Sequence, residues 1–138
     1  MMAFLDTSSL IKLYHHEDGS DWIMETLSHN QIEDIFLSEL AILEFRSALW
    51  KKVRVKELEE TSAIEVIQCF QNDKDHYEWI ALQDDIVVPA SKLLMKYGNR
   101  GLRTLDSLQL ASALSLKEKN GVFLTSDKLL YAENITFS

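Results

Sequence analysis

One stretch in the last third of the 138-residue chain reads Leu102-Arg103-Thr104-Leu105-Asp106-Ser107-Leu108-Gln109-Leu110-Ala111-Ser112-Ala113-Leu114. Most residues after Thr104 are good helix formers or small, and apolar side chains cover most sides of the resulting helix. Such a helix is expected to be buried on most sides, and Asp106 lies in its first turn. A buried carboxylate is costly unless it is paired, hydrogen-bonded or bound to a metal ion. We therefore searched the rest of the chain for groups that could accompany Asp106.

Length and composition predict a single domain, residues 1–138, with a sizeable hydrophobic core. Hydrophobic residues make up 46% of the chain, and 1 Pro and 4 Gly argue against long linkers and a turn-rich all-β fold. The single cysteine, Cys69, cannot form an intramolecular disulfide, which fits a reducing compartment. No apolar run reaches membrane-span length, and the first residues lack a secretory signal pattern. These features predict a soluble, cytoplasmic protein.

The net charge is −8, from 14 basic and 22 acidic residues, which argues against a nucleic-acid binder that relies on electrostatic attraction alone. This charge is compatible with an enzyme that holds phosphate groups through metal ions, and with a basic partner protein. One basic run, at residues 51–56, ends an expected long helix. Such a run is usually a solvated helix face, and contact with nucleic acid is the alternative interpretation.

Two segments have the same order of features: an apolar strand, then hydroxyl residues, then a helix. Each segment also has an acid close to the end of its strand. Residues 1–5 are apolar and are followed by Asp6 and three hydroxyl residues; residues 121–124 are followed by Thr125, Ser126 and Asp127. Ligands bind at the carboxyl ends of strands in open α/β sheets, so both acids are candidate site residues. Asp is also a favoured helix N-cap, and for Asp6 the capping role alone remains an open alternative.

The remaining elements also alternate between strand and helix. Helices are expected at 21–28, 39–55, from the acidic run at 57–60 to about residue 70, at 86–97 and at 128–130, and short strands at 35–37, 77–80 and 134–137. We expect Pro89 near the first turn of its helix, where a missing N–H costs little. Strands that alternate with helices predict an α/β domain with a largely parallel sheet and right-handed crossovers.

A fourth acid, Glu44, lies near the middle of the 39–55 helix between apolar neighbours, although Glu39 is an alternative if the helix register differs. If Glu44 converges with the other three acids, their mutual repulsion requires protonation or neutralisation by cations. Hard oxygen ligands and only 4 histidines favour Mg²⁺ or Mn²⁺ over Zn²⁺. Such ions activate water and neutralise a phosphodiester during its cleavage.

The chain resembles the PIN-domain ribonucleases, in particular the VapC toxins of bacterial and archaeal toxin–antitoxin pairs. The resemblance covers nearly the whole chain and depends on the order and spacing of its motifs. These motifs are Phe4-Leu5-Asp6-Thr7-Ser8-Ser9-Leu10-Ile11-Lys12-Leu13-Tyr14, Ser38-Glu39-Leu40-Ala41 with Glu44-Phe45-Arg46-Ser47-Ala48-Leu49, Gly101-Leu102-Arg103-Thr104-Leu105-Asp106, and Phe123-Leu124-Thr125-Ser126-Asp127.

The resemblance implies a three-layer α/β/α sandwich with a central, mainly parallel sheet, and a metal-dependent endoribonuclease that cleaves RNA. It also implies a small inhibitory antitoxin and a homodimer. The implied catalytic residues and ligands to Mg²⁺ or Mn²⁺ are Asp6, Glu44, Asp106 and Asp127. The implied supporting residues are Thr125, with Ser126 and Ser8 as further candidates. We expect backbone contacts with RNA from Arg103, Arg46 or the basic run at 51–56.

Two other functions remain open from the sequence. A PIN-like binding module would keep the fold and the acids but act through a protein partner, with little or no nuclease activity; cation-dependent cleavage separates it from an enzyme. A phosphoacceptor domain similar to response regulators also binds Mg²⁺ at strand ends. That class requires an acidic pair near the first strand, and only Asp6 is present there.

Overall fold

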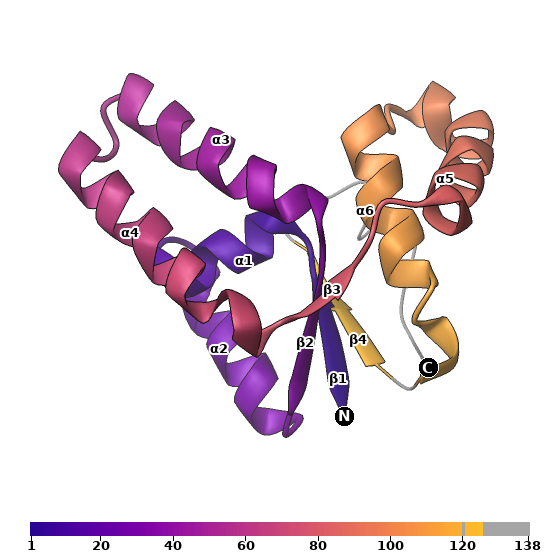
Figure 1. The fold of residues 1–138 in the computed structure, drawn as a ribbon, viewed down its shortest axis with the longest axis horizontal. Coiled ribbons are helices and arrows are strands. Elements are labelled where there is room, and N and C mark those ends of the chain that lie inside the picture. The colour runs from indigo at the N-terminus through magenta and orange to yellow at the C-terminus, as the bar shows by residue number, and fades with distance from the viewer. Residues whose placement is uncertain (120, 126–138) are drawn as a thin grey trace.

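The computed structural model describes residues 1–119 and 121–125 of the chain (Figure 1). In this part of the chain, strands alternate with helices as the sequence predicts. The strands are β1 (Met2–Leu5), β2 (Asp34–Ser38), β3 (Glu78–Ile80) and β4 (Gly121–Leu124). The helices are α1 (Thr7–Tyr14), α2 (Ser20–His29), α3 (Leu40–Arg54), α4 (Glu60–Asp73), α5 (Asp84–Tyr97) and α6 (Thr104–Leu114). Short 3₁₀ helices, η1 (Lys74–His76), η2 (Gly98–Arg100) and η3 (Lys117–Lys119), follow α4, α5 and α6.

The strands form one parallel sheet in the order β3-β2-β1-β4. Strand β1 lies inside the sheet, where Phe4 is opposite Phe36 of β2 and Phe123 of β4. Strand β3 pairs with the outer side of β2. Because all pairs are parallel, the carboxyl ends of the strands share one edge of the sheet. The predicted parallel sheet is therefore confirmed, and the expected last helix and strand at 128–130 and 134–137 lie outside the described residues.

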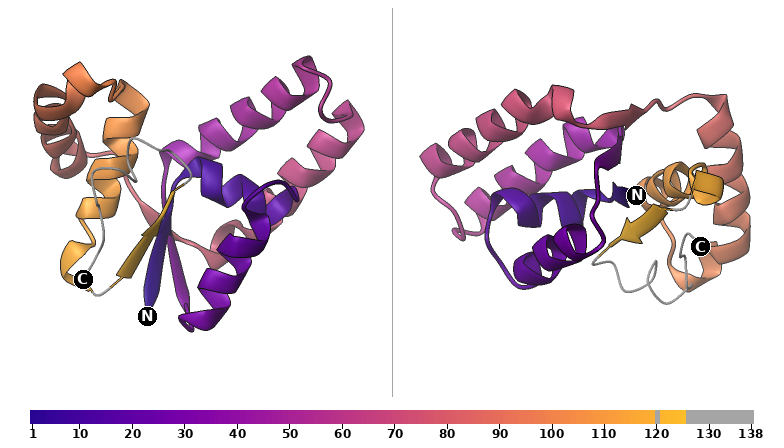
Figure 2. Two further views of the ribbon diagram at one scale, coloured as in Figure 1. Left: turned by 180° about the vertical axis from the view of Figure 1, so that it is seen from behind. Right: turned by 90° about the horizontal axis from the view of Figure 1, so that it is seen from below.

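Helices cover both faces of the sheet, which confirms the expected three-layer α/β/α sandwich. Helices α1 to α4 lie on one face, and α5 and α6 lie on the other (Figures 1 and 2). The pleat of β1 divides its side chains between the two layers. Ala3 and Leu5 pack into the core shared with α1, α2, α3 and α4, whereas Phe4 packs with Ala113 of α6.

Helix α6 differs from the expectation of a mainly apolar buried helix. Its buried side chains include three polar ones, Ser107, Gln109 and Ser112, whereas Leu105 is 48% exposed. The Ser107 and Ser112 hydroxyls donate hydrogen bonds to the carbonyls of Thr104 and Leu108, so their burial is inexpensive. Gln109 instead makes hydrogen bonds outside its own helix, with Thr7 of α1 and Glu44 of α3.

Helix α5 also departs from expectation at one residue. It begins at Asp84, so Pro89 lies in its second turn and not near its first turn. Proline has no N–H to donate to the Asp85 carbonyl, and this loss is tolerated on an exposed helix face where water can bind that carbonyl. None of the helices in the described ranges combines the length and the apolar character needed to cross a membrane.

Candidate functional site

Asp6 immediately follows β1, at the carboxyl edge of the sheet, and it caps α1. Its Oδ1 accepts hydrogen bonds from the Ser9 backbone N–H (3.0 Å) and the Ser8 hydroxyl (2.9 Å), and its Oδ2 accepts one from the Thr125 hydroxyl. The side chain is only 5% exposed. Burial raises the pKa of Asp6 above its usual range, and the donors from Thr125, Ser9 and Ser8 oppose this rise. Asp6 thus caps α1, and it also lies at the predicted edge of the sheet, so the cap does not exclude a role in the site.

Glu44 is joined to two other elements through one of its carboxylate oxygens. Its Oε1 accepts hydrogen bonds from the Thr7 hydroxyl (2.8 Å) and from Nε2 of Gln109 (2.7 Å). The same Nε2 lies 3.1 Å from the Thr7 hydroxyl oxygen. These contacts bring the first residue of α1, the second turn of α3 and the second turn of α6 together next to Asp6. Among the described residues, Thr7 and Gln109 contact only Oε1 of Glu44 and not Oε2.

The alternative helical acid, Glu39, lies elsewhere. It precedes α3 as the N-cap residue, it is exposed, and its Oε2 accepts a long hydrogen bond from the Leu82 N–H (3.4 Å). Glu44, one turn and a half further along the helix, has the contacts with α1 and α6. Helix α3 therefore has the register that the sequence analysis preferred.

Thr7 and Gln109 belong to this cluster, and neither was predicted from the sequence as a site residue. Gln109 is buried, and its Oε1 has no hydrogen-bond partner among the described residues. The carboxylate of Glu44 can only accept hydrogen bonds when it is ionised, so the amide must direct its NH₂ towards Glu44 and not its oxygen. A signal was available: Gln109 lies three residues after Asp106, which places both on one face of α6, among leucine and alanine.

Asp106 occupies the first turn of α6, as predicted, but it is not a deeply buried carboxylate. It is half-buried, and its Oδ2 accepts a hydrogen bond from the Arg103 backbone N–H at 3.2 Å. An acid at this position satisfies a free donor at the start of the helix and interacts favourably with the helix dipole. The expected burial cost is avoided because the carboxylate remains partly in water.

The fourth predicted acid, Asp127, and the supporting residue Ser126 lie outside the described residues. Thr125, directly after β4, is described and buried, and it donates to Asp6 as noted above. The structure therefore brings Asp6, Ser8 and Thr125 together, and places Glu44 beside Thr7. Arg46, an expected RNA contact, is directed elsewhere: its guanidinium donates to the Ile42 carbonyl and to Gln71 of α4.

The described residues of the cluster carry oxygen donors of the kind that a hard divalent cation binds. These donors make up only part of a coordination shell. Within residues 1–119 and 121–125, no three carboxylate, imidazole or thiol groups are close enough together to hold a metal ion. The available donors are carboxylate, hydroxyl and amide oxygens, including the unpartnered Oε1 of Gln109. Oxygen donors of this kind suit Mg²⁺ or Mn²⁺.

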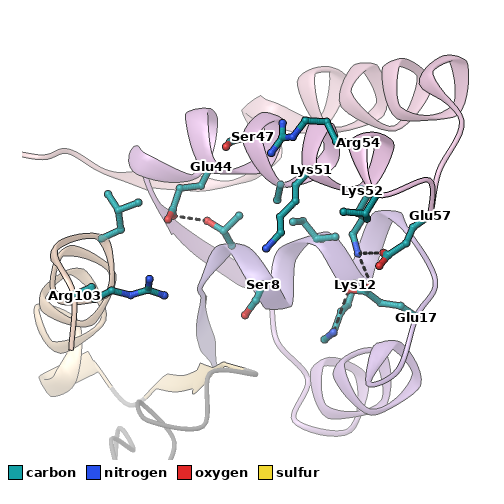
Figure 3. A pocket seen from close by; sticks show the side chains of 15 residues that line it. Ser8, Lys12, Glu17, Glu44, Ser47, Lys51, Lys52, Arg54, Glu57 and Arg103 are labelled. Carbon is teal, nitrogen blue, oxygen red and sulfur yellow. Dashed lines mark hydrogen bonds and ion pairs between the residues drawn. The ribbon is translucent and has the colours of Figure 1, made fainter. Parts of the chain in front are cut away.

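A pocket of about 670 Å³ opens beside Glu44. Its walls come from α1, α3, the segment after α3 and the start of α6, and Ser8 and Arg103 both lie along it (Figure 3). The arrangement therefore combines hydrogen-bonded carboxylates at a sheet edge with an open space large enough for part of a ligand.

The sequence matches the PIN domain family over residues 3–132. The chain therefore belongs to the PIN domain family. No curated protein matches the sequence significantly.

Several solved structures are similar to this chain over nearly its whole length. VapC20 of Mycobacterium tuberculosis, described as a Sarcin-Ricin loop cleaving toxin, is 14% identical; the match covers 99% of this chain and 98% of VapC20, with a TM-score of 0.67. FitAcB from Neisseria gonorrhoeae is 13% identical, with 98% and 95% covered and a TM-score of 0.68. VapBC2 from Rickettsia felis, bound to a DNA fragment from its promoter, is 15% identical, with 96% and 92% covered and a TM-score of 0.64. At these identities the likeness shows a shared fold.

Proposed function

We propose that this chain is an endoribonuclease that depends on Mg²⁺ or Mn²⁺, with Asp6, Glu44, Asp106 and Asp127 as its catalytic acids and metal ligands. Membership of the PIN family supports this proposal. The observation that carries it is the cluster of Thr7, Glu44 and Gln109 beside the capped Asp6, where the pocket opens. Parallel α/β sheets bind ligands at this edge.

The residues of the proposed site have separate tasks. A bound divalent cation would neutralise charge on the phosphodiester and lower the pKa of the attacking water. Asp6 is fixed by its three donors, and Glu44 is fixed through Oε1, so Oε2 remains for a ligand. Asp106 keeps Oδ1 outside its hydrogen bond with the Arg103 N–H. Asp6, Glu44 and Asp106 are thus oriented by the protein before a substrate arrives, which reduces reorganisation during the reaction.

We propose further that the protein is the toxin of a toxin–antitoxin pair. In this proposal it acts in the cytoplasm as a single domain, residues 1–138, forms a homodimer, and is inhibited by a small antitoxin. The support is its likeness in fold to VapC20, described as a toxin, and to VapBC2 and FitAcB. Co-expression of this chain with the product of an adjacent small gene, followed by purification, tests the partner.

The test of the nuclease is cleavage of a mixed cellular RNA pool by the purified protein in Mg²⁺, in Mn²⁺ and in EDTA. The variant Asp106→Asn keeps the size of the side chain but removes its charge, and we expect a loss of cleavage of about 100-fold or more, since metal-assisted charge neutralisation contributes several kcal/mol. The matched control is Asp75→Asn, the same change at an exposed residue of η1, outside the site.

Discrete, cation-dependent cuts that Asp75→Asn retains and Asp106→Asn loses would support the enzyme. Equal cleavage by a folded Asp106→Asn protein would contradict the assignment. Cleavage by neither wild type nor variants, together with a protein partner retained by all of them, would favour the alternative, a PIN-like binding module with little or no nuclease activity.

A further inference from the structure

The pocket beside Glu44 is lined by an unusual concentration of positive charge for a chain with a net charge of −8. Of the 14 basic residues in the sequence, 5 line this pocket. They are Lys12, Lys51, Lys52, Arg54 and Arg103. The acids among the lining residues are Glu17, Glu44 and Glu57. The electrostatic character of the pocket therefore depends on which of these charges neutralise one another.

Two of the lysines are already neutralised by ion pairs. Glu17 Oε1 lies 3.1 Å from Lys12 Nζ, and its Oε2 lies 2.8 Å from Lys52 Nζ, which also lies 3.6 Å from Glu57. Burial alone would raise the pKa of Glu17, but the hydrogen bonds and charges of Lys52 and Lys12 outweigh it and lower that pKa. These lysines and acids form a fixed, nearly neutral wall of the pocket (Figure 3).

The other three cations have no carboxylate partner among the described residues. Lys51 extends from α3, and Arg103 extends from the position just before α6, towards the same space from two sides of the pocket (Figure 3). Arg54 lies further along α3. Cations that face one space without counter-ions repel one another, so an anion in that space is favoured. Lys51, Arg54 and Arg103 lie beside the proposed phosphodiesterase site of an otherwise acidic protein. These three cations therefore offer a subsite for phosphate.

The position of Lys51 further along α3 fits a chain of phosphates that extends from Glu44. Lys51 follows Glu44 by seven residues on α3, so the two residues share a face, and their Cα atoms are about 10 Å apart along the helix axis. An RNA strand that runs from Glu44 along this face of α3 would therefore bring a further phosphate to Lys51. Ile11, Ala48 and the half-exposed Leu105 supply apolar surface in the same pocket for sugar or base.

We propose that this pocket binds the RNA backbone next to the scissile phosphate, with Lys51 as the principal phosphate contact and Arg54 and Arg103 beside it. The proposal rests on the proposed nuclease function of the adjoining acids. Lysine contacts a phosphate as a point charge and reads no base, so the subsite contributes affinity and strand direction and not sequence preference.

The test is binding of a fluorescein-labelled, single-stranded oligouridylate, measured by anisotropy in EDTA so that metal-dependent cleavage does not interfere. We expect Lys51→Gln to weaken binding about fivefold, and to reduce the slope of log affinity against log salt by about 0.7, the value for one phosphate contact on a single strand. Lys92→Gln, the same change at an exposed residue of α5 outside the pocket, is the control and leaves both quantities unchanged.

A second variant makes the pocket more positive, whereas Lys51→Gln makes it less positive. Glu17→Gln removes the counter-ion of Lys12 and Lys52, so we expect tighter RNA binding and a steeper dependence on salt. Unchanged affinity and slope in Lys51→Gln would overturn the subsite, as would a wild type that does not bind the oligouridylate. Tighter binding of an oligoglutamate peptide than of the RNA would also overturn it, and would assign the pocket to an acidic protein segment.

These outcomes are separate from those of the cleavage test. A protein that cleaves RNA but binds it equally well with Lys51→Gln keeps its nuclease assignment and loses this subsite. A protein that does not cleave RNA, but whose RNA binding depends on Lys51, loses the nuclease assignment and keeps the subsite as part of a binding module.

Discussion

The two ends of α1 contain similar chemical groups in different surroundings. At the N-terminal end, Asp6 accepts hydrogen bonds from the Ser8 and Thr125 hydroxyls, and Glu44 of α3 accepts one from the Thr7 hydroxyl. At the C-terminal end, the Tyr14 hydroxyl donates to Oδ2 of Asp73 in α4 at 2.8 Å and contacts the Tyr77 hydroxyl. Both ends therefore tie α1 to distant parts of the chain through a carboxylate and hydroxyl groups.

The surroundings decide what each cluster can do. Tyr14 lies edge-on to Phe45 and Phe70, whose rings stack with centroids 4.3 Å apart. Burial raises the pKa of both Tyr14 and Tyr77, and hydrogen bonding between them adds to this for Tyr14, so the hydroxyls stay protonated at ordinary pH. Glu44 instead faces a pocket and retains an oxygen outside its internal contacts. The Tyr14 end is therefore part of the packed core, whereas the Asp6 end adjoins the pocket at which we propose the chemistry takes place.

The largest expected effect is on stability, at the Tyr14 end. Phe70 is 2% exposed and contacts Tyr14, Phe45, Tyr77 and Trp79. Phe70→Ala removes this ring and leaves a cavity, so we expect a loss of about 3–5 kcal/mol in the free energy of unfolding, measured by urea denaturation. RNA cleavage per folded molecule should be retained, and Phe70→Leu should lose less stability. A folded Phe70→Ala protein without cleavage would show that the two ends are not separate.

The next effect is on activity, at the Asp6 end. Gln109→Leu keeps the buried volume but removes the N–H donor to Glu44 and Thr7. We expect cleavage to fall about 10–100-fold, the usual cost of losing a group that orients a metal ligand. The loss should be in kcat and in Mn²⁺ affinity, and not in KM, because Gln109 does not line the pocket. The free energy of unfolding should change by about 1 kcal/mol or less, because Glu44 keeps Thr7 and is partly solvated.

A conservative variant distinguishes orientation of Glu44 from simple packing. Gln109→His retains a ring N–H that can donate to Glu44, and we expect it to recover part of the kcat and the Mn²⁺ affinity that Gln109→Leu loses. If both variants bind Mn²⁺ as wild type does, Gln109 does not position the metal ligand. If both lose stability by several kcal/mol, its role is structural.

The fold could be predicted because strand and helix signals were local. The apolar run at 1–5 and the run at 121–124 are short and end at hydroxyl or acidic residues, which is sufficient to place β1 and β4. Pro89 was misplaced because the two acids that begin α5, Asp84 and Asp85, stabilise a helix start further upstream than its first apolar residue. The position of a helix end depends on such small electrostatic contributions, so helix ends are less predictable from sequence than the helices themselves.

The site was only partly predictable because its contacts are long-range. Asp6 and Glu44 were found as acids at a strand end and on an apolar helix face. Thr7 and Gln109 are separated by 102 residues in sequence, and no local pattern reports a hydrogen bond across that distance. Burial of Asp106 was overestimated because the apolar pattern of α6 does not show that its first turn is half-exposed and its second turn buries Gln109.

The smallest expected effect is a change in stability with pH, caused by Glu17 in the wall of the pocket. The pKa of Glu17 is lowered in the folded protein, so its ion pairs stabilise the fold above the ordinary Glu pKa of about 4.3, and this contribution is lost as the pH falls through the lowered value. The carboxylate is 25% exposed, so solvent screening limits the contribution to about 1 kcal/mol or less.

Measurement of the free energy of unfolding from pH 7 down to the lowest pH at which the protein still folds would reveal the contribution of the Glu17 ion pairs. Glu17→Gln should be less stable than wild type near neutral pH, and the two curves should converge as the pH falls from the ordinary Glu pKa through the lowered one. Glu65→Gln, the same change at an exposed residue of α4 without an ion pair among the described residues, should follow wild type throughout. A constant difference between wild type and Glu17→Gln at all pH values would mean that Glu17 stabilises the wall by packing. In that case Glu17→Gln would no longer serve as a charge-only variant in the RNA-binding test.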